Sequence, residues 1–151
     1  MQNITPFLWF DTHAEEAMNF YASIFPRFKA IAVRRAGGQV MSVEFEVNGQ
    51  RLIGLNGGPM YKFTEAFSLF VPCDTQAEID DLWTRLTAGG GEPGRCGWLK
   101  DRFGLSWQVV PTALTSLLSG PDPARSGRVV QAMMQMNKLD LAGLQRAHDG
   151  V

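Results

Sequence analysis

A five-residue pattern occurs twice in this chain of 151 residues, and it constrains the fold more than any other feature. The first copy is Asp11-Thr12-His13-Ala14-Glu15, and the second is Asp74-Thr75-Gln76-Ala77-Glu78. Each copy follows an apolar run typical of a strand and precedes apolar residues at helical spacing. A Thr followed three residues later by a Glu is a capping box, which marks the first turn of a helix. The repeat therefore predicts two strand–helix units, as expected from an internal duplication.

The first half of the chain has the pattern of one strand, one helix and three further strands. The helix begins at the first copy of the motif and reaches about Phe25, because Pro26 stops it. Asn48-Gly49 is a strong signal for a two-residue hairpin turn between two strands. The predicted strands are Ile4–Phe10, Lys29–Arg35, Val40–Val47 and Arg51–Leu55.

The second half repeats this order in shorter form. A predicted helix over Gln76–Ala88 follows the second copy of the motif, and Gly89-Gly90-Gly91 ends it. Asn56-Gly57-Gly58-Pro59 ends the preceding sheet and begins the loop that links the two copies. The predicted strands of this half are Ala66–Val71, Pro93–Arg95, Gly97–Lys100 and Leu105–Val110.

The tail after Pro111 differs from both repeats and has helical spacing. Val129–Met136 and Leu139–His148 are predicted short helices, and we expect their methionines in a core or a subunit contact. We therefore expect a single domain of two modules, residues 1–58 and residues 59–111, followed by a helical tail over residues 112–151.

Charge and composition exclude several classes of function. The 14 basic and 15 acidic residues nearly cancel, which argues against a nucleic-acid partner. The sequence has neither a signal-peptide pattern nor an apolar run of the ~20 residues that span a bilayer, so we expect no membrane partner. The two cysteines, Cys73 and Cys96, lack metal-binding spacing and fit a reducing compartment. The expected location is the cytoplasm.

Several blocks of the sequence resemble the PhnB-like branch of the vicinal-oxygen-chelate superfamily, which includes glyoxalase I, the bleomycin-resistance proteins and the extradiol dioxygenases. Members of this branch are often labelled demethylubiquinone methyltransferases. The resemblance implies an α+β fold of two tandem βαβββ modules, whose curved mixed sheets surround a ligand cavity, with the C-terminal helices added, and it implies a homodimer or a paired-module fold. The blocks that carry it are Phe20-Tyr21, Ile24-Phe25-Pro26, Leu55-Asn56-Gly57-Gly58-Pro59, Phe63-Thr64-Glu65-Ala66, Cys96-Gly97-Trp98-Leu99-Lys100-Asp101 and Phe103 to Pro111.

The residues at the superfamily's metal positions do not suit a catalytic metal. Enzymes of the superfamily place His or Glu on the first and last strands of each module, where these side chains bind a divalent ion. Here those strands offer Asn56, Ser68 and Gln108, which are weak neutral ligands, and Gln108 stands where the resemblance implies a Glu. We expect His13 to be solvated and His148 to lie at a frayed end. The sequence therefore predicts no metal and no cofactor. It also lacks the glycine-rich loop after a strand that would hold a nucleotide-type methyl donor.

The remaining candidate is a cavity lined by aromatic and amide side chains. Tryptophans supply a stacking surface for a planar ligand, amides and hydroxyls orient it, and a lysine suits an anionic group. The alternatives from the residues alone are that the tryptophans are core residues, that Lys100 and Asp101 are a solvated surface pair, and that Cys96 is an inert buried thiol. The candidate ligand-binding residues are Trp9, Asn56, Ser68, Trp98, Lys100, Trp107 and Gln108.

Three functions are compatible with this sequence. The first is a metal-free, PhnB-like homodimer that binds a small planar or oxygen-rich molecule in an aromatic cavity. The second is an enzyme of the same superfamily, an isomerase, lyase or oxygenase acting on a small oxygen-rich substrate. The third is a structural dimer module without a ligand. The residues do not decide whether a reaction is catalysed, and they assign no catalytic residue.

Overall fold

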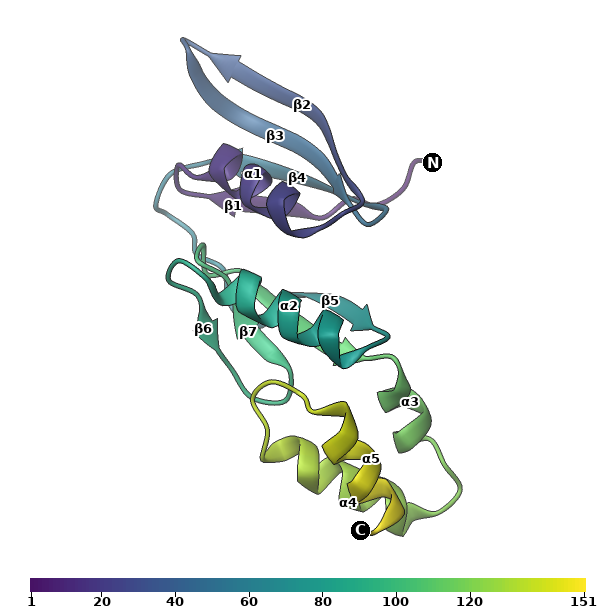
Figure 1. The fold of residues 1–151 in the computed structure, drawn as a ribbon. Coiled ribbons are helices and arrows are strands. Elements are labelled where there is room, and N and C mark those ends of the chain that lie inside the picture. Colours follow the sequence, from purple (N-terminus) through teal and green to yellow (C-terminus); the bar gives the residue numbers. More distant parts are fainter. The chain divides into compact units, whose positions relative to one another are not determined.

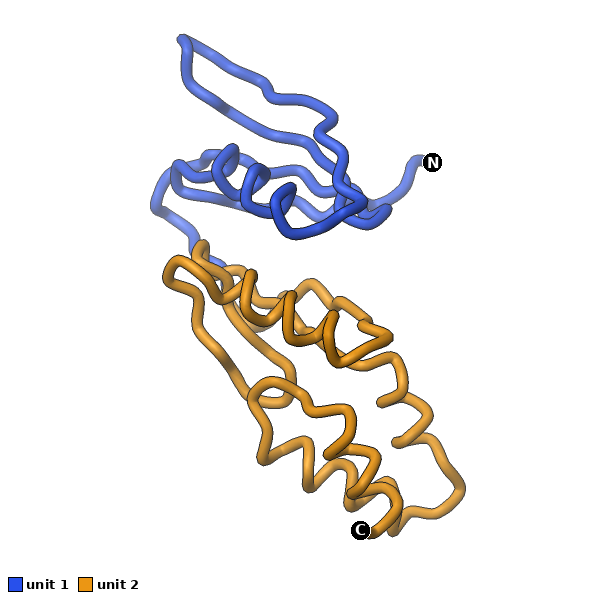
Figure 2. Tube along the Cα trace, viewed as in Figure 1, with its two compact units in different colours: residues 1–63 blue, residues 64–151 orange.

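The computed structural model describes all residues 1–151 and confirms the α+β class. The chain forms two four-stranded mixed sheets with helices, and three further helices follow the second sheet (Figure 1). It divides into two compact units, residues 1–63 and residues 64–151 (Figure 2). Each sheet is open, with two edge strands. No helix is both long enough and apolar enough to cross a membrane.

The first unit has the predicted βαβββ order. The order of the strands in the sheet is β1-β4-β3-β2. The first strand, β1, pairs in parallel with the last, β4, and the other two pairs, β4 with β3 and β3 with β2, are antiparallel. The turn between β3 and β4 has positive φ at Asn48 and Gly49, as a primed hairpin turn requires. The elements are β1 (Phe7–Phe10), α1 (Ala14–Ile24), β2 (Phe28–Ala36), β3 (Gln39–Val47) and β4 (Gln50–Asn56).

The helix α1 buries one face against this sheet. Its inward side chains recur at helical spacing, and the Tyr21 ring lies 6.0 Å from the ring of Phe45 on β3. Phe28 of β2 also stacks on Phe45, with the ring centroids 5.7 Å apart. These aromatic side chains form the centre of the first unit's core. The buried residues of the helix are Ala14, Ala17, Met18, Tyr21 and Ile24.

The capping box predicted at Thr12 and Glu15 is wrong. The N-cap residue is His13, whose side chain makes no capping bond. Instead, the Ala14 backbone N–H donates to Oδ1 of Asn56 at 2.8 Å, and the Asn56 amide donates to the Val40 carbonyl at 3.1 Å. The end of β4 therefore satisfies the helix start, and Glu15 is left to pair with an arginine on β2.

The second unit repeats the βαβββ order, and its capping box is confirmed. Thr75 Oγ1 accepts from the Glu78 backbone N–H at 3.2 Å, and the Glu78 carboxylate accepts from the Thr75 N–H at 3.3 Å. β5 pairs with β8 in parallel, and the strand order is β5-β8-β7-β6. The elements are β5 (Ser68–Cys73), α2 (Gln76–Thr87), β6 (Glu92–Pro93), β7 (Trp98–Lys100) and β8 (Ser106–Pro111).

The two faces of this second sheet differ. Trp107 and Leu99 are cross-strand partners, are each 2% exposed and belong to the core together with Ile79 of α2. Neighbouring residues on a strand point to opposite faces, so Gln108 and Ser106 lie on the face opposite Trp107 and α2. Phe70 pairs with Gln108 on that face and is 57% exposed.

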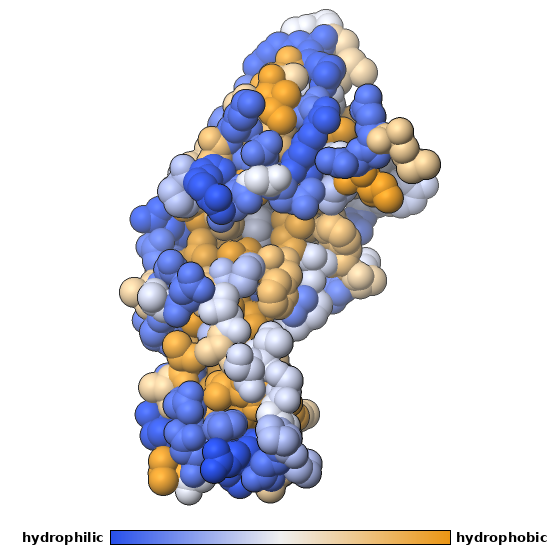
Figure 3. Space-filling model, turned by 90° about the vertical axis from the view of Figure 1, so that its right-hand side faces the viewer, coloured by the Kyte–Doolittle hydropathy of each residue, from blue (hydrophilic) through white to orange (hydrophobic).

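The surface of the protein is mostly polar on the side shown in Figure 3. Hydrophilic side chains cover most of that side, and hydrophobic ones reach the surface in several places.

Asp101 is a buried organising residue of the turn before β8, and the prediction that it forms a solvated surface pair is wrong. It is 2% exposed, and its Oδ2 accepts from the Trp107 indole N–H at 2.9 Å. Its Oδ1 accepts from the backbone N–H groups of Phe103 and Leu105, at 2.9 and 3.1 Å. A single carboxylate therefore holds both the turn and the largest side chain of the core.

The C-terminal helices form a small core of their own on the second unit. They are α3 (Ala113–Leu118), α4 (Pro123–Met134) and α5 (Leu141–Asp149). The methionines Met133 and Met136 pack against this core, as the sequence predicts. The connection between α4 and α5 is tied to the sheet, because the Cys96 and Gly97 N–H groups donate to the carbonyls of residues 136 and 137 at 2.9 and 2.8 Å. The core residues are Val110, Leu114, Leu117, Val129, Leu139 and Leu144.

Replacing the two motif threonines separately tests the difference between the helix starts. Thr75→Ala removes the oxygen that caps α2, and the loss of such a cap costs about 1 kcal/mol of unfolding free energy. Thr12→Ala is the matched control, for which we expect a change below about 0.5 kcal/mol. Urea unfolding followed by circular dichroism measures both variants. Equal losses would contradict the assignment of the Asn56 cap to α1.

Asp101→Asn tests the buried carboxylate. Its amide can no longer accept from both the turn and the Trp107 indole, and one buried donor is left unpaired at a cost of about 1 to 3 kcal/mol. Asp81→Asn is the control, since Asp81 forms an exposed pair with Arg85 on α2. Thermal unfolding should show a clear loss for Asp101→Asn alone. Similar melting temperatures for both variants would show that the carboxylate is dispensable.

Candidate functional site

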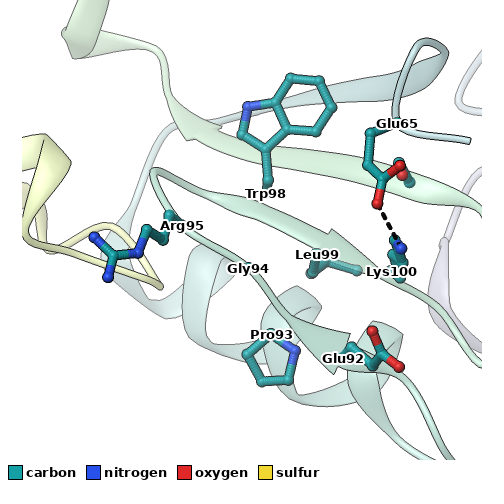
Figure 4. Close-up of a pocket in the computed structure, with 9 residues that line it drawn as sticks. Glu65, Glu92, Pro93, Gly94, Arg95, Trp98, Leu99 and Lys100 are labelled. Carbon is teal, nitrogen blue, oxygen red and sulfur yellow. Dashed lines mark ion pairs between the residues drawn. The ribbon is translucent and has the colours of Figure 1, made fainter.

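The second unit contains a pocket of about 470 Å³ beside its short strands β6 and β7 (Figure 4). Pockets for small molecules commonly have volumes of about 300 to 1,000 Å³ and combine an apolar lining with a few polar groups. This pocket has that character, because Pro93 and the Trp98 ring lie beside charged groups and a hydroxyl. The charged and hydroxyl side chains in its lining are Glu65, Glu92, Arg95, Lys100 and Ser106.

The strand register places three of these side chains on one face of the sheet. Trp98 and Lys100 are two residues apart on β7, so their side chains point to the same side at a spacing of roughly 6.6 Å. Ser106 on β8 is the cross-strand partner of Lys100. Side chains that are cross-strand partners lie within direct reach of each other. An aromatic surface, a cation and a hydroxyl therefore converge on the pocket.

Lys100 forms an ion pair with Glu65, which precedes β5. Its Nζ lies 2.5 Å from Oε1 of Glu65, and the two side chains are 36% and 63% exposed. Their hydrogen bond holds the pKa of Glu65 below its ordinary value and raises the pKa of Lys100. Both groups are therefore charged at neutral pH, and Lys100 presents a protonated ammonium to the pocket.

Ser106 is the functional candidate that sequence reasoning missed. It is 1% exposed, and its hydroxyl has no hydrogen-bond partner in the protein. A buried hydroxyl without a partner is unfavourable by about 1 to 3 kcal/mol, so such a group in a pocket lining is a candidate for contact with a ligand. The feature of the sequence that could have identified Ser106 is its alternation with Gln108 along an otherwise apolar strand.

Ser68 and Gln108 lie next to this group on the same face. The Gln108 amide donates to Ser68 Oγ at 2.9 Å. Gln108 is the cross-strand partner of Trp98, and Ser68 is the parallel-strand partner of Ser106. The structure thus brings four of the predicted site residues onto one face of the second sheet. They are Ser68, Trp98, Lys100 and Gln108.

Three other predicted site residues have structural partners elsewhere. Trp107 is buried in the core beneath the sheet, bonded to Asp101. Trp9 belongs to the first unit, where its indole N–H donates to the Gly58 carbonyl at 2.8 Å and its ring meets Tyr61 edge-on at 5.0 Å. Asn56 uses both ends of its amide to hold α1 and β3.

The metal-ligating side chains of the chain are dispersed. No group of three or more His, Cys, Asp or Glu side chains is arranged to hold one. His13 and His148 each lie beside a neighbouring carboxylate, at 3.0 and 3.1 Å. Ser68 and Gln108, two of the residues expected at metal positions, bond to each other.

The two cysteines are free thiols with different surroundings. Burial, aided by the nearby carboxylates of Glu78 and Asp74, raises the pKa of Cys73 to about 11. Cys73 is therefore a protonated, inert thiol at neutral pH. Cys96 is half-buried and has φ of 58°, in the turn that leads into β7.

Comparisons with known proteins agree with this architecture. The family profile of 3-demethylubiquinone-9 3-methyltransferase matches residues 2–110. A PhnB protein from Bacillus cereus is 34% identical, with a TM-score of 0.68 over 74% of this chain and 100% of that chain. Protein PA1353 from Pseudomonas aeruginosa is 21% identical, with a TM-score of 0.60 over 74% and 98% of the two chains.

The fold extends to more distant structures. A glyoxylase/bleomycin resistance protein/dioxygenase domain from Frankia sp. EAN1pec is 13% identical, with a TM-score of 0.51 over 74% of this chain and 92% of that domain. No curated protein matches the sequence. The helices α3 to α5 lie beyond Val110, where the family match ends. On the family match and the Bacillus cereus relative, the chain belongs to the 3-demethylubiquinone-9 3-methyltransferase family, the PhnB-like branch of the vicinal-oxygen-chelate superfamily.

Proposed function

We propose that this chain is a small-molecule-binding protein that holds a planar or oxygen-rich ligand, without a metal ion, in the pocket of its second unit. The observation that carries the proposal is the buried hydroxyl of Ser106, which lacks a partner and lines a pocket beside Trp98 and Lys100. A ligand that accepts or donates a hydrogen bond there removes the energetic cost of the unpaired hydroxyl.

The rest of the pocket supports a binding role. Trp98 and Pro93 offer apolar surface, and a tryptophan ring favours stacking with a planar molecule. The ammonium of Lys100 stays protonated because Glu65 raises its pKa, so it orients a ligand by charge and does not serve as a general base near neutral pH. The polar groups of the pocket thus suit recognition better than proton transfer.

The proposal includes a homodimer that works in the cytoplasm. Phe70 and Phe67 are 57% and 45% exposed, and Phe70 shares a face of the second sheet with its partner Gln108. Burying such side chains against a second copy removes apolar surface from water. The two free thiols suit a reducing compartment.

Trp98→Ala tests the pocket. The probes are indole-3-carboxamide and indole-3-carboxylate. We expect the variant to lose at least about tenfold in affinity for whichever probe binds, since stacking of a planar ring on an aromatic side chain contributes about 1 to 3 kcal/mol. Isothermal titration calorimetry at high probe concentration measures the dissociation constants.

Trp83→Ala is the matched control, because Trp83 lies on α2 outside the pocket lining. It should leave the affinity unchanged. Equal losses in both variants, or binding unaffected by Trp98→Ala, would remove the pocket assignment. Native mass spectrometry of the same samples counts the subunits, and a monomer at micromolar concentration would contradict the homodimer.

A further inference from the structure

We propose that the ligand is a planar carboxylic acid whose carboxylate replaces Glu65 at Lys100 and accepts a hydrogen bond from Ser106. This inference rests on the proposed binding function and specifies its ligand class. It follows from three features of the pocket: an internal carboxylate already bound to Lys100, a neighbouring donor left unused, and an aromatic side chain on the same face of the sheet.

Glu65 shows that this site accepts a carboxylate. Its Oε1 lies 2.5 Å from Lys100 Nζ, and the two side chains face each other in Figure 4. The Glu65 side chain is 63% exposed and precedes β5, outside the sheet. Exposed ion pairs of long side chains contribute little net stability, so an incoming anion can displace this one. Glu65 is therefore an internal stand-in for the ligand's carboxylate.

Ser106 shows that the stand-in is incomplete. Its hydroxyl has no partner although Lys100, its cross-strand neighbour, is bonded to Glu65. A carboxylate has two acceptor oxygens, and cross-strand partners are close enough for one carboxylate to meet both. A ligand carboxylate can thus bind the ammonium with one oxygen and the hydroxyl with the other. Glu65 satisfies only the first of these donors.

Trp98 sets the shape of the rest of the ligand. It lies two residues before Lys100 on the same face, roughly 6.6 Å away along the strand. An aromatic ring that carries its carboxylate directly, or through one or two atoms, can stack on Trp98 while the carboxylate reaches Lys100. Aliphatic acids lack the stacking surface, and neutral aromatics lack the anion.

Glu92 restricts the ligand's charge. It is the partner of Lys100 on the other side of β7, and its carboxylate lines the same pocket. A monoanionic carboxylate that replaces Glu65 leaves the local charge unchanged, whereas a dianion such as phosphate adds a negative charge beside Glu92. Arg95 is the other cation in the lining, and Figure 4 shows its side chain directed away from the Glu65–Lys100 pair. The charges therefore favour a carboxylate over a phosphate.

A matched pair of probes tests this inference. Indole-3-carboxylate and indole-3-carboxamide have nearly the same shape and differ in charge. We expect the carboxylate to bind at least about tenfold more tightly to the unmodified protein, as a charge-assisted hydrogen bond implies. Calorimetry or ligand-observed NMR gives both dissociation constants. Equal affinities, or tighter binding of the carboxamide, would overturn the carboxylate assignment while leaving the binding function intact. If neither probe binds, both proposals fail.

Three substitutions locate the contact. Glu65→Gln should strengthen carboxylate binding several-fold without affecting the carboxamide, because it removes the competing anion. Lys100→Gln should abolish the preference for the carboxylate, and Ser106→Ala should weaken it. Lys29→Gln, at an exposed lysine on β2, is the control for loss of a positive charge and should change neither affinity. Carboxylate binding that is unchanged in Glu65→Gln and Lys100→Gln would overturn the displacement of Glu65.

Discussion

The parallel pairing of the first strand of each module with its last strand is the constraint on which the structure depends. In both units the helix after the first strand crosses back over the sheet, and the three following strands end beside the strand that began the unit. In the second unit this pairing aligns Ser68 with Ser106, and the antiparallel step to β7 aligns Ser106 with Lys100. The candidate site is a product of that register, since a shift of one residue would exchange its side chains for core residues.

The two units share a plan but use different interactions at equivalent places. α2 is capped by its own Thr75 and Glu78, whereas α1 is capped by Asn56 from the end of β4. The first unit commits Trp9 and Asn56 to internal hydrogen bonds. The second unit leaves a hydroxyl unpaired beside a tryptophan and a paired lysine, and it carries the three added helices. The two units therefore use equivalent positions differently, and the pocket with the unpaired hydroxyl lies in the second.

Local signals in the sequence predicted most of the fold. Asn48-Gly49 specified its turn and Thr75 with Glu78 specified a helix start, because each acts through residues close in the chain. The same reasoning failed at Thr12, because the Ala14 N–H at the helix start bonds to the Asn56 amide, which is 42 residues from Ala14. Trp98, Lys100 and Trp107 were all predicted to bind a ligand, and only the strand register separates the first two, on the pocket face, from Trp107 in the core. Ser106 was missed because a serine is informative only once its burial and its neighbours are known.

The four tryptophans, Trp9, Trp83, Trp98 and Trp107, provide the most direct test of the claim that the second unit's pocket is the ligand site. Their indole N–H signals report on the first unit, on α2, on the pocket and on the buried core, respectively. A ¹⁵N–¹H correlation experiment with added indole-3-carboxylate follows all four at once. If the ligand binds in this pocket, the Trp98 signal shifts most. A larger shift of Trp9 or Trp83, or no shift at all, would contradict that claim.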